Sequence, residues 1–386
     1  MLFIHDHTFL HYKDTYYTTG SLNDRVMGRY KRWFGRVDVF ATTRDVTQKD
    51  AAFLKAENSV HGINFHLIPK KRSVLGLLQS MKPLKDEVKK ADCIVIRMSL
   101  LGALGVYYAR KYKKPYLVEM VACPWDSLWN HSVKGKILAP FMTVLTKYVC
   151  KRAPYVLYVT NEFLQRRYPS RQHSIGCSDV ELTNIDDNAI EKRLSVIAGL
   201  QGVSSLRIGT VANVAVRYKD QELVIRSLKK LNEHGIHCDY YLIGGGSPEY
   251  LKQVANQEGV SAQVHFIGPV PHEEIFGYVD KLDLYVQPSL QEGLPRAVIE
   301  AMSRGCPVIG SSAGGIPELI DQDCVFEKGN RESLVTTVLG LSKEKMRRMA
   351  SHNFAKSKEY DKALLDSRRE QFYVGFYQSS VKGIEQ

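Results

Sequence analysis

The sequence predicts an α/β protein of two doubly wound domains that face a central cleft. Short apolar runs alternate with longer amphipathic segments, which is typical of βαβ units and mostly parallel sheets. The pattern occurs as two series of similar size, separated by a polar, loop-like stretch over residues 171–205. A chain of 386 residues is long enough for two hydrophobic cores. In such folds ligands bind beyond the carboxyl ends of the strands, so we expect the site in the cleft.

The two series define the expected elements in order. In the first series, strands are predicted over residues 1–5, 37–42, 63–68, 92–97, 115–122 and 155–160, with a helix over residues 102–114. In the second, strands are predicted over residues 207–214, 238–246, 264–270, 282–289, 306–312 and 324–327, and the chain from residue 342 onward is mostly helical. We therefore place one domain at residues 1–185, joined by the C-terminal helix 365–386, and the other at residues 186–364.

Composition limits the class of protein. Lys and Arg number 53 against 41 Asp and Glu, a net charge of +12, which favours a polyanionic partner such as nucleic acid, an anionic membrane or a phosphorylated ligand. The seven cysteines are scattered and never form C-x-x-C, so we expect neither a disulfide framework nor a zinc site. The start, MLFIHDHTFLHYK, lacks the pattern of a signal peptide, and the apolar runs are short for a membrane span. A cytoplasmic protein is expected.

The stretch PSLQEGLPRAVIEAMSRGCPVIGSSAGGIPELI carries the strongest chemical signal. A buried strand leads into a glycine-containing loop, and Pro295 suits the first turn of a helix that runs to about Arg304. Glu292 lies on the loop beside the amides of Gly293 and Leu294, where unpaired N–H groups attract phosphate. Glu300 lies inside the helix among apolar neighbours, so it needs partners or a cleft edge. Sugar or ribose hydroxyls would suit both carboxylates.

This stretch resembles the donor-binding segment of retaining glycosyltransferases of family 4, as found in bacterial capsule, O-antigen and other polysaccharide synthesis. The resemblance covers residues 207–328 well and the first domain loosely. It implies the GT-B architecture of two Rossmann-like domains. It also implies that Glu292 faces the donor sugar, that Glu300 binds the ribose, and that Gly293, Leu294 and Pro295 lie beside the sugar or diphosphate.

The family also has a basic pair that clamps the diphosphate. Lys219 matches its lysine, whereas Asn213 occupies the place of its arginine and Arg217 lies nearby. The resemblance further implies donor contacts from Gly244 in the run Gly244–Gly246, and from the backbone near Phe266 and Ile267 beside the base.

The first domain offers weaker matches. Gly20, with Thr19 and Ser21, stands where relatives have a glycine-bearing loop near the donor phosphate and the acceptor. Relatives often have a histidine after the strand at residues 115–122, and this sequence has none there. Asp126 or Glu119 is the candidate acceptor-side base, with His131 a more distant one.

Two basic segments could account for the net positive charge in another way, as surfaces that contact an anionic membrane. Residues 25–36 interleave arginine and lysine with aromatic side chains, and residues 134–152 place Phe141, Val144, Leu145 and Tyr148 on one helical face. Either segment suits an anionic membrane interface or, alternatively, a helix packed on its own sheet with a solvated basic face. Nucleic acid is not expected, since no binding motif accompanies the charge.

The combined prediction is a metal-independent retaining hexosyltransferase without a cofactor. It would use a UDP- or GDP-sugar and a glycan or polyprenyl-linked acceptor, peripherally at the inner face of the cell membrane. Lys219, Glu292 and Asp126 are the predicted catalytic groups. Two alternatives remain: a nucleotide-sugar 2-epimerase on the same scaffold, and a non-catalytic nucleotide-sugar-binding subunit of a membrane glycan assembly.

Overall fold

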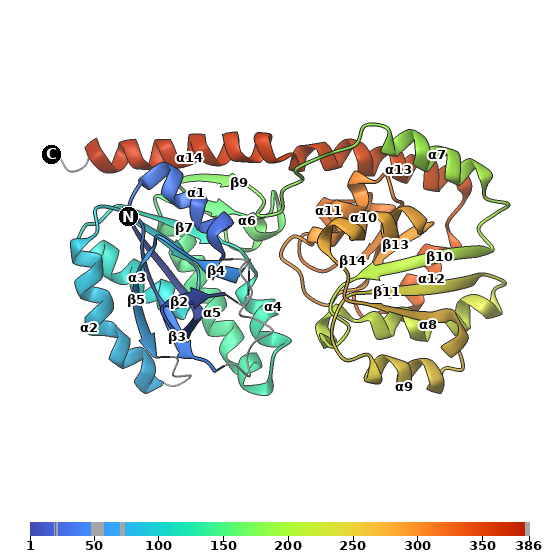
Figure 1. The fold of residues 1–386 in the computed structure, drawn as a ribbon, viewed down its shortest axis with the longest axis horizontal. Coiled ribbons are helices and arrows are strands. Elements are labelled where there is room, and N and C mark those ends of the chain that lie inside the picture. The colour runs from blue at the N-terminus through green and yellow to red at the C-terminus, as the bar shows by residue number, and fades with distance from the viewer. Residues whose placement is uncertain (19, 21, 48–57, 70–73, 383–386) are drawn as a thin grey trace.

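The computed structural model describes residues 1–18, 20, 22–47, 58–69 and 74–382. It contains two α/β halves side by side, each with its own sheet between helices (Figure 1). The two-domain doubly wound fold predicted from the sequence is thus confirmed. The domain limits at residues 185 and 186 stay a prediction.

The first sheet is mostly parallel. Its parallel strands lie in the order β5-β3-β1-β6-β7-β8-β9, and short strands β2 and β4 add an antiparallel extension beside β1. This order crosses from one direction to the other between β1 and β6. The strands are β1 (Leu2–Tyr12), β2 (Thr15–Tyr17), β3 (Asp38–Asp45), β4 (Ser59–Val60), β5 (Asn64–Pro69), β6 (Ile94–Arg97), β7 (Tyr116–Met120), β8 (Tyr155–Tyr158) and β9 (His173–Gly176).

Helices cover this sheet, and several begin at side-chain caps that the sequence supplies. Ser99 and Ser132 each accept a hydrogen bond from the backbone three residues later, which fixes the starts of α3 and α5. The helices of this half are α1 (Asp24–Phe34), α2 (Val74–Lys90), α3 (Leu100–Lys111), α4 (Pro124–Trp129), α5 (Val133–Arg152) and α6 (Phe163–Arg167).

The second sheet is entirely parallel, in the order β12-β11-β10-β13-β14-β15. Its strands are β10 (Ser205–Val211), β11 (His237–Ile243), β12 (Val264–Gly268), β13 (Leu284–Gln287), β14 (Val308–Ser311) and β15 (Val325–Phe326). Its helices are α7 (Ala189–Gly199), α8 (Gln221–Glu233), α9 (Glu249–Gln257), α10 (His272–Lys281), α11 (Arg296–Ser303), α12 (Arg331–Leu339) and α13 (Lys343–Ser357), with 3₁₀ turns η3 (Arg217–Lys219), η4 (Ser261–Gln263), η5 (Ile316–Glu318), η6 (Gln322–Cys324) and η7 (Lys358–Tyr360). The chain changes direction across the sheet between β10 and β13, the switch point at which such folds bind ligands.

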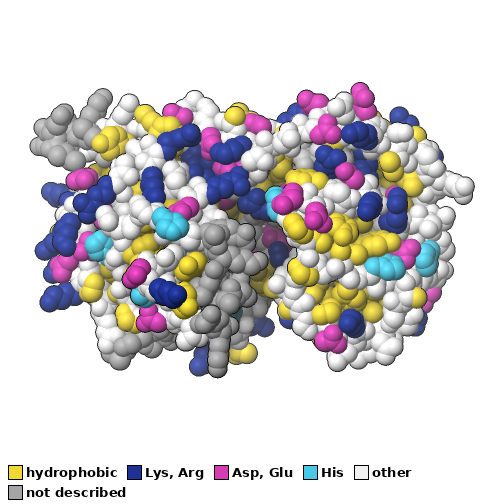
Figure 2. All heavy atoms as spheres, viewed as in Figure 1, with side chains coloured by type: hydrophobic (Ala, Val, Ile, Leu, Met, Phe, Trp, Pro, Cys, Tyr) yellow, Lys and Arg dark blue, Asp and Glu magenta, His cyan; other side chains and the backbone are white. Residues whose placement is uncertain are grey.

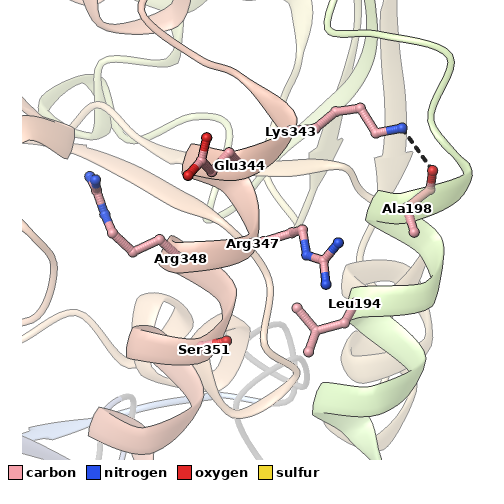
Figure 3. A pocket seen from close by; sticks show the side chains of 7 residues that line it. All are labelled: Leu194, Ala198, Lys343, Glu344, Arg347, Arg348 and Ser351. Atoms are coloured by element: carbon pink, nitrogen blue, oxygen red, sulfur yellow. Dashed lines mark hydrogen bonds between the residues drawn. The ribbon is translucent and has the colours of Figure 1, made fainter.

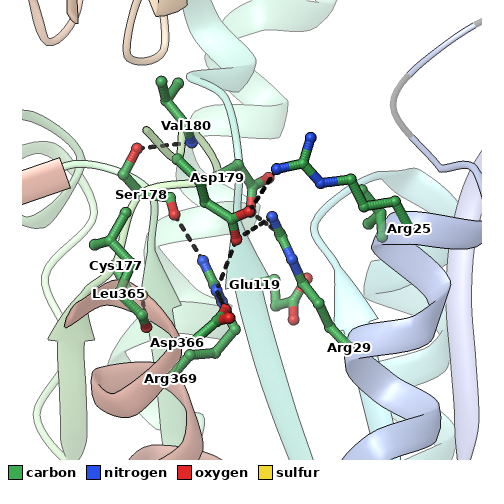
Figure 4. A network of polar contacts seen from close by, with 12 residues as sticks. Arg25, Arg29, Glu119, Cys177, Ser178, Asp179, Val180, Leu365, Asp366 and Arg369 are labelled. Carbon is green, nitrogen blue, oxygen red and sulfur yellow. Dashed lines mark hydrogen bonds and ion pairs between the residues drawn. The ribbon is translucent and has the colours of Figure 1, made fainter. Parts of the chain in front are cut away.

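The last helix, α14 (Lys362–Lys382), returns to the first half (Figure 1). A buried ionic network holds it there (Figure 4). Arg369 donates to the carbonyl of Ser178 at 2.6 Å and pairs with Glu181, which also binds Arg29 of α1. The Tyr373 hydroxyl donates to Glu119 at 2.6 Å. The C-terminal segment is therefore part of the packing of the first half, up to the last residue described.

Two sequence expectations need correction. The stretch over residues 171–205 contains strand β9 and helix α7, so it is not a continuous loop. Strand β9 is an exposed edge strand that pairs with β8, and its polar side chains conceal it in the sequence. The first strand also runs to Tyr12 rather than ending near residue 5, and continues into an antiparallel hairpin with β2.

The basic segment at residues 25–36 packs against its own protein. Tyr30 is buried in the core, and Phe34 contacts Tyr373 of α14 with ring centroids 5.6 Å apart. Arg25 and Arg29 pair with Glu181. The packing alternative for this segment is the one that the structure supports.

All seven cysteines are buried free thiols. Of the helices in the described ranges, none is long and apolar enough to cross a bilayer.

Candidate active site

The switch point of the second sheet brings Lys219 and Glu292 together. Lys219 lies on η3 after β10, and Glu292 lies on the loop after β13. Because β10 and β13 are neighbouring parallel strands, these loops leave the same edge of the sheet. Lys219 Nζ donates to Glu292 Oε1 at 2.7 Å. The sequence named both residues, and the fold explains why residues far apart in the chain meet.

Glu292 is held in one orientation by neutral donors as well. Its Oε1 also accepts hydrogen bonds from Gln287 Nε2 at 3.0 Å and from Ser289 Oγ at 2.7 Å. The side chain is 9% exposed, and Lys219 is 22% exposed. Oε2 takes part in none of these three contacts, so it is the oxygen suited to a ligand hydroxyl. Gln287 and Ser289, at the end of β13, were not identified from the sequence.

The loop between Glu292 and α11 is built on close backbone packing. Gly315 N donates to the carbonyl of Gly293 at 2.8 Å. Gly314 has φ of +56°, and a Cβ there would lie 2.0 Å from the Glu292 carbonyl oxygen, so only glycine fits. Helix α11 begins at Arg296 with Pro295 as its N-cap, one residue later than predicted. The amides of Gly293 and Leu294 therefore lie immediately before the helix start, whose unpaired N–H groups favour anions.

Glu300 is buried in α11 and has a partner that the sequence did not reveal. Its side chain is 4% exposed, and His272 Nε2 at the start of α10 lies 2.7 Å from its Oε1. Arg296, one turn earlier, is 4.0 Å away. His272 itself is more than half exposed. A ribose that bound Oε1 of this carboxylate would therefore compete with His272.

The other predicted diphosphate contacts lie differently. The Arg217 guanidinium stacks on Tyr250, 3.1 Å from the ring centroid, and pairs with Glu222, so it is directed toward α9 rather than Glu292. The Asn213 side chain accepts a hydrogen bond from the amide of Ala215 at 2.9 Å and shapes the turn after β10. The structure therefore brings Lys219 to the carboxylate and gives Arg217 and Asn213 local partners.

Two predicted donor contacts lie at irregular backbone beside the switch point. Gly244 has φ of +150°, and a Cβ there would meet the Ala212 carbonyl at 2.2 Å. Strands β11 and β12 pair Leu242 with Phe266 and then Ile243 with Gly268, so Ile267 is an extra residue in the ladder. Such a bulge frees backbone groups and is common near binding sites.

Asp126 of the first half lies near the loop that carries Glu292, since its neighbour Ser127 contacts Gln291. Asp126 is buried in the first turn of α4, and Lys328 of the second half lies 3.9 Å from its Oδ1. Glu119 is 2% exposed and bound by Tyr30, Arg97 and Tyr373, so its oxygens serve the internal network. His131 is exposed in the turn that follows α4.

Gly20 lies beyond the β1–β2 hairpin, where its amide donates to Thr18 Oγ1 at 3.0 Å. Thr18 Oγ1 in turn lies 2.8 Å from His7 Nε2. These contacts stay within the first half, and Thr19 and Ser21 lie outside the described residues.

The two halves meet directly at the Glu292 loop. Gln291 donates to Ser127 Oγ at 3.3 Å, and Asn130 Nδ2 donates to Gln291 Oε1 at 3.4 Å. A Cβ on Gly293 would lie 3.0 Å from the Val121 carbonyl oxygen. The donor-side loop and the segment after β7 thus form one wall. Figure 2 shows the hollow between the halves, with Lys and Arg side chains on its border.

Glu318 forms a second bridge between the halves and was missed, although its segment had been singled out. Its carboxylate accepts the amides of Asn161 at 2.8 Å, Glu162 at 2.8 Å and Phe163 at 3.1 Å. These are orphan donors at the start of α6, so Glu318 caps a helix of the other half. The carboxylate in the GGIPE sequence was the available signal.

Burial perturbs one carboxyl near the site. Desolvation raises the pKa of Asp220 to about 7; Glu222 adds repulsion, while Arg217 and Arg226 oppose the shift. Asp220 follows Lys219 directly and has φ of +52°, a left-handed conformation that Asp and Asn tolerate best. Asp220 is also the N-cap residue of α8, so this carboxyl lies at the start of that helix.

A cavity of about 590 Å³ lies away from the motif, between α7 and α13 (Figure 3). Lys343 there donates to the carbonyl of Ala198 at 2.8 Å. Its lining belongs to the outer side of the second half and includes none of the predicted site residues.

Within the described residues, no three His, Cys, Asp or Glu side chains are grouped to bind a metal ion. Metal independence stays a prediction.

Comparison with protein families matches residues 205–344 to the family described as Glycosyl transferases group 1. This range therefore matches a group 1 glycosyltransferase domain. The matched range contains Lys219, Glu292, Glu300 and both glycine loops. The glycosyltransferase identity that the sequence suggested is confirmed, whereas the roles of its individual residues stay predictions.

Similarity to one relative covers most of the chain and so includes both halves. Protein CapJ of Staphylococcus aureus is 29% identical over 335 residues, covering 85% of this chain and 82% of CapJ. Amylovoran biosynthesis glycosyltransferase AmsK of Erwinia amylovora is 30% identical over 200 residues, covering 48% of this chain and 49% of AmsK.

Solved structures confirm the predicted GT-B fold. Sucrose-phosphate synthase from Thermosynechococcus elongatus has a TM-score of 0.67 at 15% identity, covering 98% of this chain and 99% of that one. HepE of Anabaena in complex with UDP has a TM-score of 0.65 at 16% identity, covering 97% and 99%. At such identities the likeness concerns the fold alone.

Proposed function

We propose that this glycosyltransferase is a retaining enzyme of cell-surface polysaccharide synthesis. It transfers a hexose-type sugar from a UDP- or GDP-sugar to a glycan or polyprenyl-linked acceptor. The observation that carries the proposal is the Lys219–Glu292 pair at the switch point, beside the start of α11. Relatives named for amylovoran, colanic acid and O-antigen synthesis support the acceptor class, and Anabaena structures with UDP and UDP-glucose support the donor class.

In this proposal the donor diphosphate meets positive charge from two sources. Lys219 leaves Glu292 in part and turns toward the leaving phosphate, and the Gly293 and Leu294 amides at the start of α11 supply fixed donors. Groups that are positioned before the reaction stabilise developing charge at little reorganisation cost. No metal ion is required by this arrangement.

The two glutamates hold different parts of the same donor. Glu292 orients the sugar through Oε2, because Oε1 is already engaged by Lys219, Gln287 and Ser289. Glu300 binds the ribose when His272 gives way. Holding both ends aligns the anomeric carbon with the acceptor hydroxyl. Asp126, buried at the wall shared by the two halves, is the acceptor-side base.

A ligand screen by thermal shift tests the donor class. Ligands that bind only the folded protein raise its apparent stability, by about 2.7 kcal/mol at a concentration 100 times the Kd. We expect the largest shift with UDP, GDP or their hexose derivatives, and a smaller one with ADP derivatives. Transfer of radiolabelled sugar to a bacterial membrane extract then tests the reaction, with Glu292→Gln as control.

The outcomes separate the alternatives. Conversion of the nucleotide sugar without any acceptor would instead support an epimerase. Tight donor binding with no transfer to any membrane extract would support the non-catalytic subunit. Absence of a shift with every nucleotide would contradict the proposal.

A further inference from the structure

Helix α5 carries an apolar face on the side that points to solvent. Gly135, Ala139, Met142, Thr146 and Val149 are buried, as expected for a helix packed on a sheet. The opposite face is also apolar, and its side chains are 46–78% exposed: Val133, Ile137, Phe141, Val144 and Tyr148. These positions recur at helical spacing along the whole helix. A continuous exposed stripe of this kind marks an interaction surface.

Positive charge flanks this stripe. The sequence has no Asp or Glu from Ser127 to Asn161, and the basic residues of α5 are exposed: Lys134, Lys136, Lys147, Lys151 and Arg152. Helical spacing places Lys134 and Arg152 on one side of the stripe and Lys136 and Lys147 on the other.

Aromatic side chains reinforce the same surface. The guanidinium of Arg152 lies over the Tyr148 ring at 4.1 Å from its centroid, and Lys136 Nζ lies over Trp129 at 5.6 Å. Arg110 of the neighbouring α3 donates to the Tyr148 hydroxyl at 3.2 Å. Apolar side chains bordered by aromatic rings and long basic chains match the interface of a lipid bilayer.

We propose that the exposed face of α5 docks on an anionic lipid bilayer. The apolar stripe enters the boundary between headgroups and acyl chains, and the flanking lysines and arginine meet lipid phosphates. Charge argues against a second copy as the occupant. A two-fold contact through this face would bring the basic borders of both copies together, with no acidic residue of the 127–161 segment to compensate.

The stripe begins next to the candidate active site. Val133 follows closely after Ser127 and Asn130, which contact Gln291, the neighbour of Glu292. Helix α4 lies between α5 and the other half in Figure 1. Docking through α5 would therefore hold the mouth of the site near the bilayer surface. That this brings a lipid-linked acceptor within reach rests on the proposed function; the docking itself does not.

Vesicle co-sedimentation of the full chain tests the docking. The vesicles are equimolar phosphatidylglycerol and phosphatidylcholine, or phosphatidylcholine alone, at low salt. We expect binding to the anionic vesicles, and at least tenfold weaker binding for Ile137→Ser/Phe141→Ser/Val144→Ser. The matched control Val196→Ser/Leu339→Ser/Leu364→Ser removes exposed apolar side chains from other surfaces and should bind as the wild type does.

A charge variant, Lys134→Gln/Lys136→Gln/Lys147→Gln, provides an independent test if the apolar variant fails to fold. It should also weaken binding to anionic vesicles at least tenfold. Wild-type protein that stays in the supernatant, or folded variants that bind like the control, would overturn the proposal. So would a wild-type dimer that the stripe variant converts to a monomer in light scattering. Donor thermal shifts on the same samples report separately on the proposed function.

Discussion

The pairing of Lys219 with Glu292 can be tested by a double-mutant cycle. The variants are Lys219→Met, Glu292→Gln and the combination. In Lys219→Met the carboxylate, 9% exposed, keeps only the neutral hydrogen bonds from Gln287 and Ser289. Breaking a fully buried pair from one side costs about 3–5 kcal/mol. Since two donors remain and Lys219 is 22% exposed, we expect a loss of about 1–3 kcal/mol of unfolding free energy.

Glu292→Gln should affect stability less. The glutamine has the same shape and keeps an acceptor, and the released Lys219 can extend into solvent, so we expect a loss of about 1 kcal/mol or less. The double variant should lose less than the sum of the singles, with a coupling of about 1–2 kcal/mol. Chemical denaturation measures all four proteins, and Lys230→Met, which breaks an exposed pair with Glu332, is the control.

Turnover should follow a different order from stability. Each single variant should lower sugar transfer about 100-fold or more, equivalent to about 2.7 kcal/mol of transition-state stabilisation. Glu292→Gln would then be nearly as stable as the wild type but far less active. Near-normal turnover in both single variants would refute the site assignment. If the double variant regained both activity and stability relative to the single variants, the pair would have a structural role and not a direct role in the reaction.

Two further predictions concern residues around the site. Asp220→Asn should flatten the pH dependence of stability between about pH 4 and 7. Because the pKa is raised on folding, the folded state still holds a proton between about pH 4 and 7 that the unfolded state has released. This group therefore lowers the free energy of unfolding as the pH rises to about 7, and causes no further loss above that pH. Thermal unfolding midpoints from pH 4 to 8 measure the effect, exposed Asp14→Asn is the control, and parallel curves for Asp220→Asn and the wild type would contradict it. Glu318→Ala should cost about 1 kcal/mol, as for a lost helix cap, and accelerate hydrogen exchange of the amides of residues 161–163. Glu318→Gln, which keeps an acceptor, should have an intermediate effect, and unchanged exchange in Glu318→Ala would exclude the cap.

The sequence predicted those parts of the site that follow from strand order. In this sheet the first and fourth strands, β10 and β13, are neighbours, so the loops with Lys219 and Glu292 approach each other even though no local pattern links them. The start of α11 near Pro295 and its end before Gly305 were also predicted to within a residue, because cap residues act locally.

Contacts made by long side chains between elements could not be predicted. Arg217 pairs with Glu222 of α8 and stacks on the ring of Tyr250 of α9. It can make both contacts because α8 packs against α9, which the sequence does not show. The same holds for His272 at Glu300, since α10 and α11 are not linked by any periodic pattern. Strand β9 escaped detection for a related reason: an edge strand needs little hydrophobicity to pair.

The segment between β7 and α5 connects the candidate active site with the proposed membrane-docking face of α5. It forms the wall against which the Glu292 loop packs, through Val121, Ser127 and Asn130. It also leads directly into the exposed stripe of α5. A force that fixes α5 on a bilayer would therefore act on the same short stretch of backbone that supports Gln291 and Glu292. If α5 docks as proposed, anionic vesicles should reduce hydrogen exchange in residues 121–130 as well as in α5, and protection confined to α5 would show that docking and the site are mechanically independent.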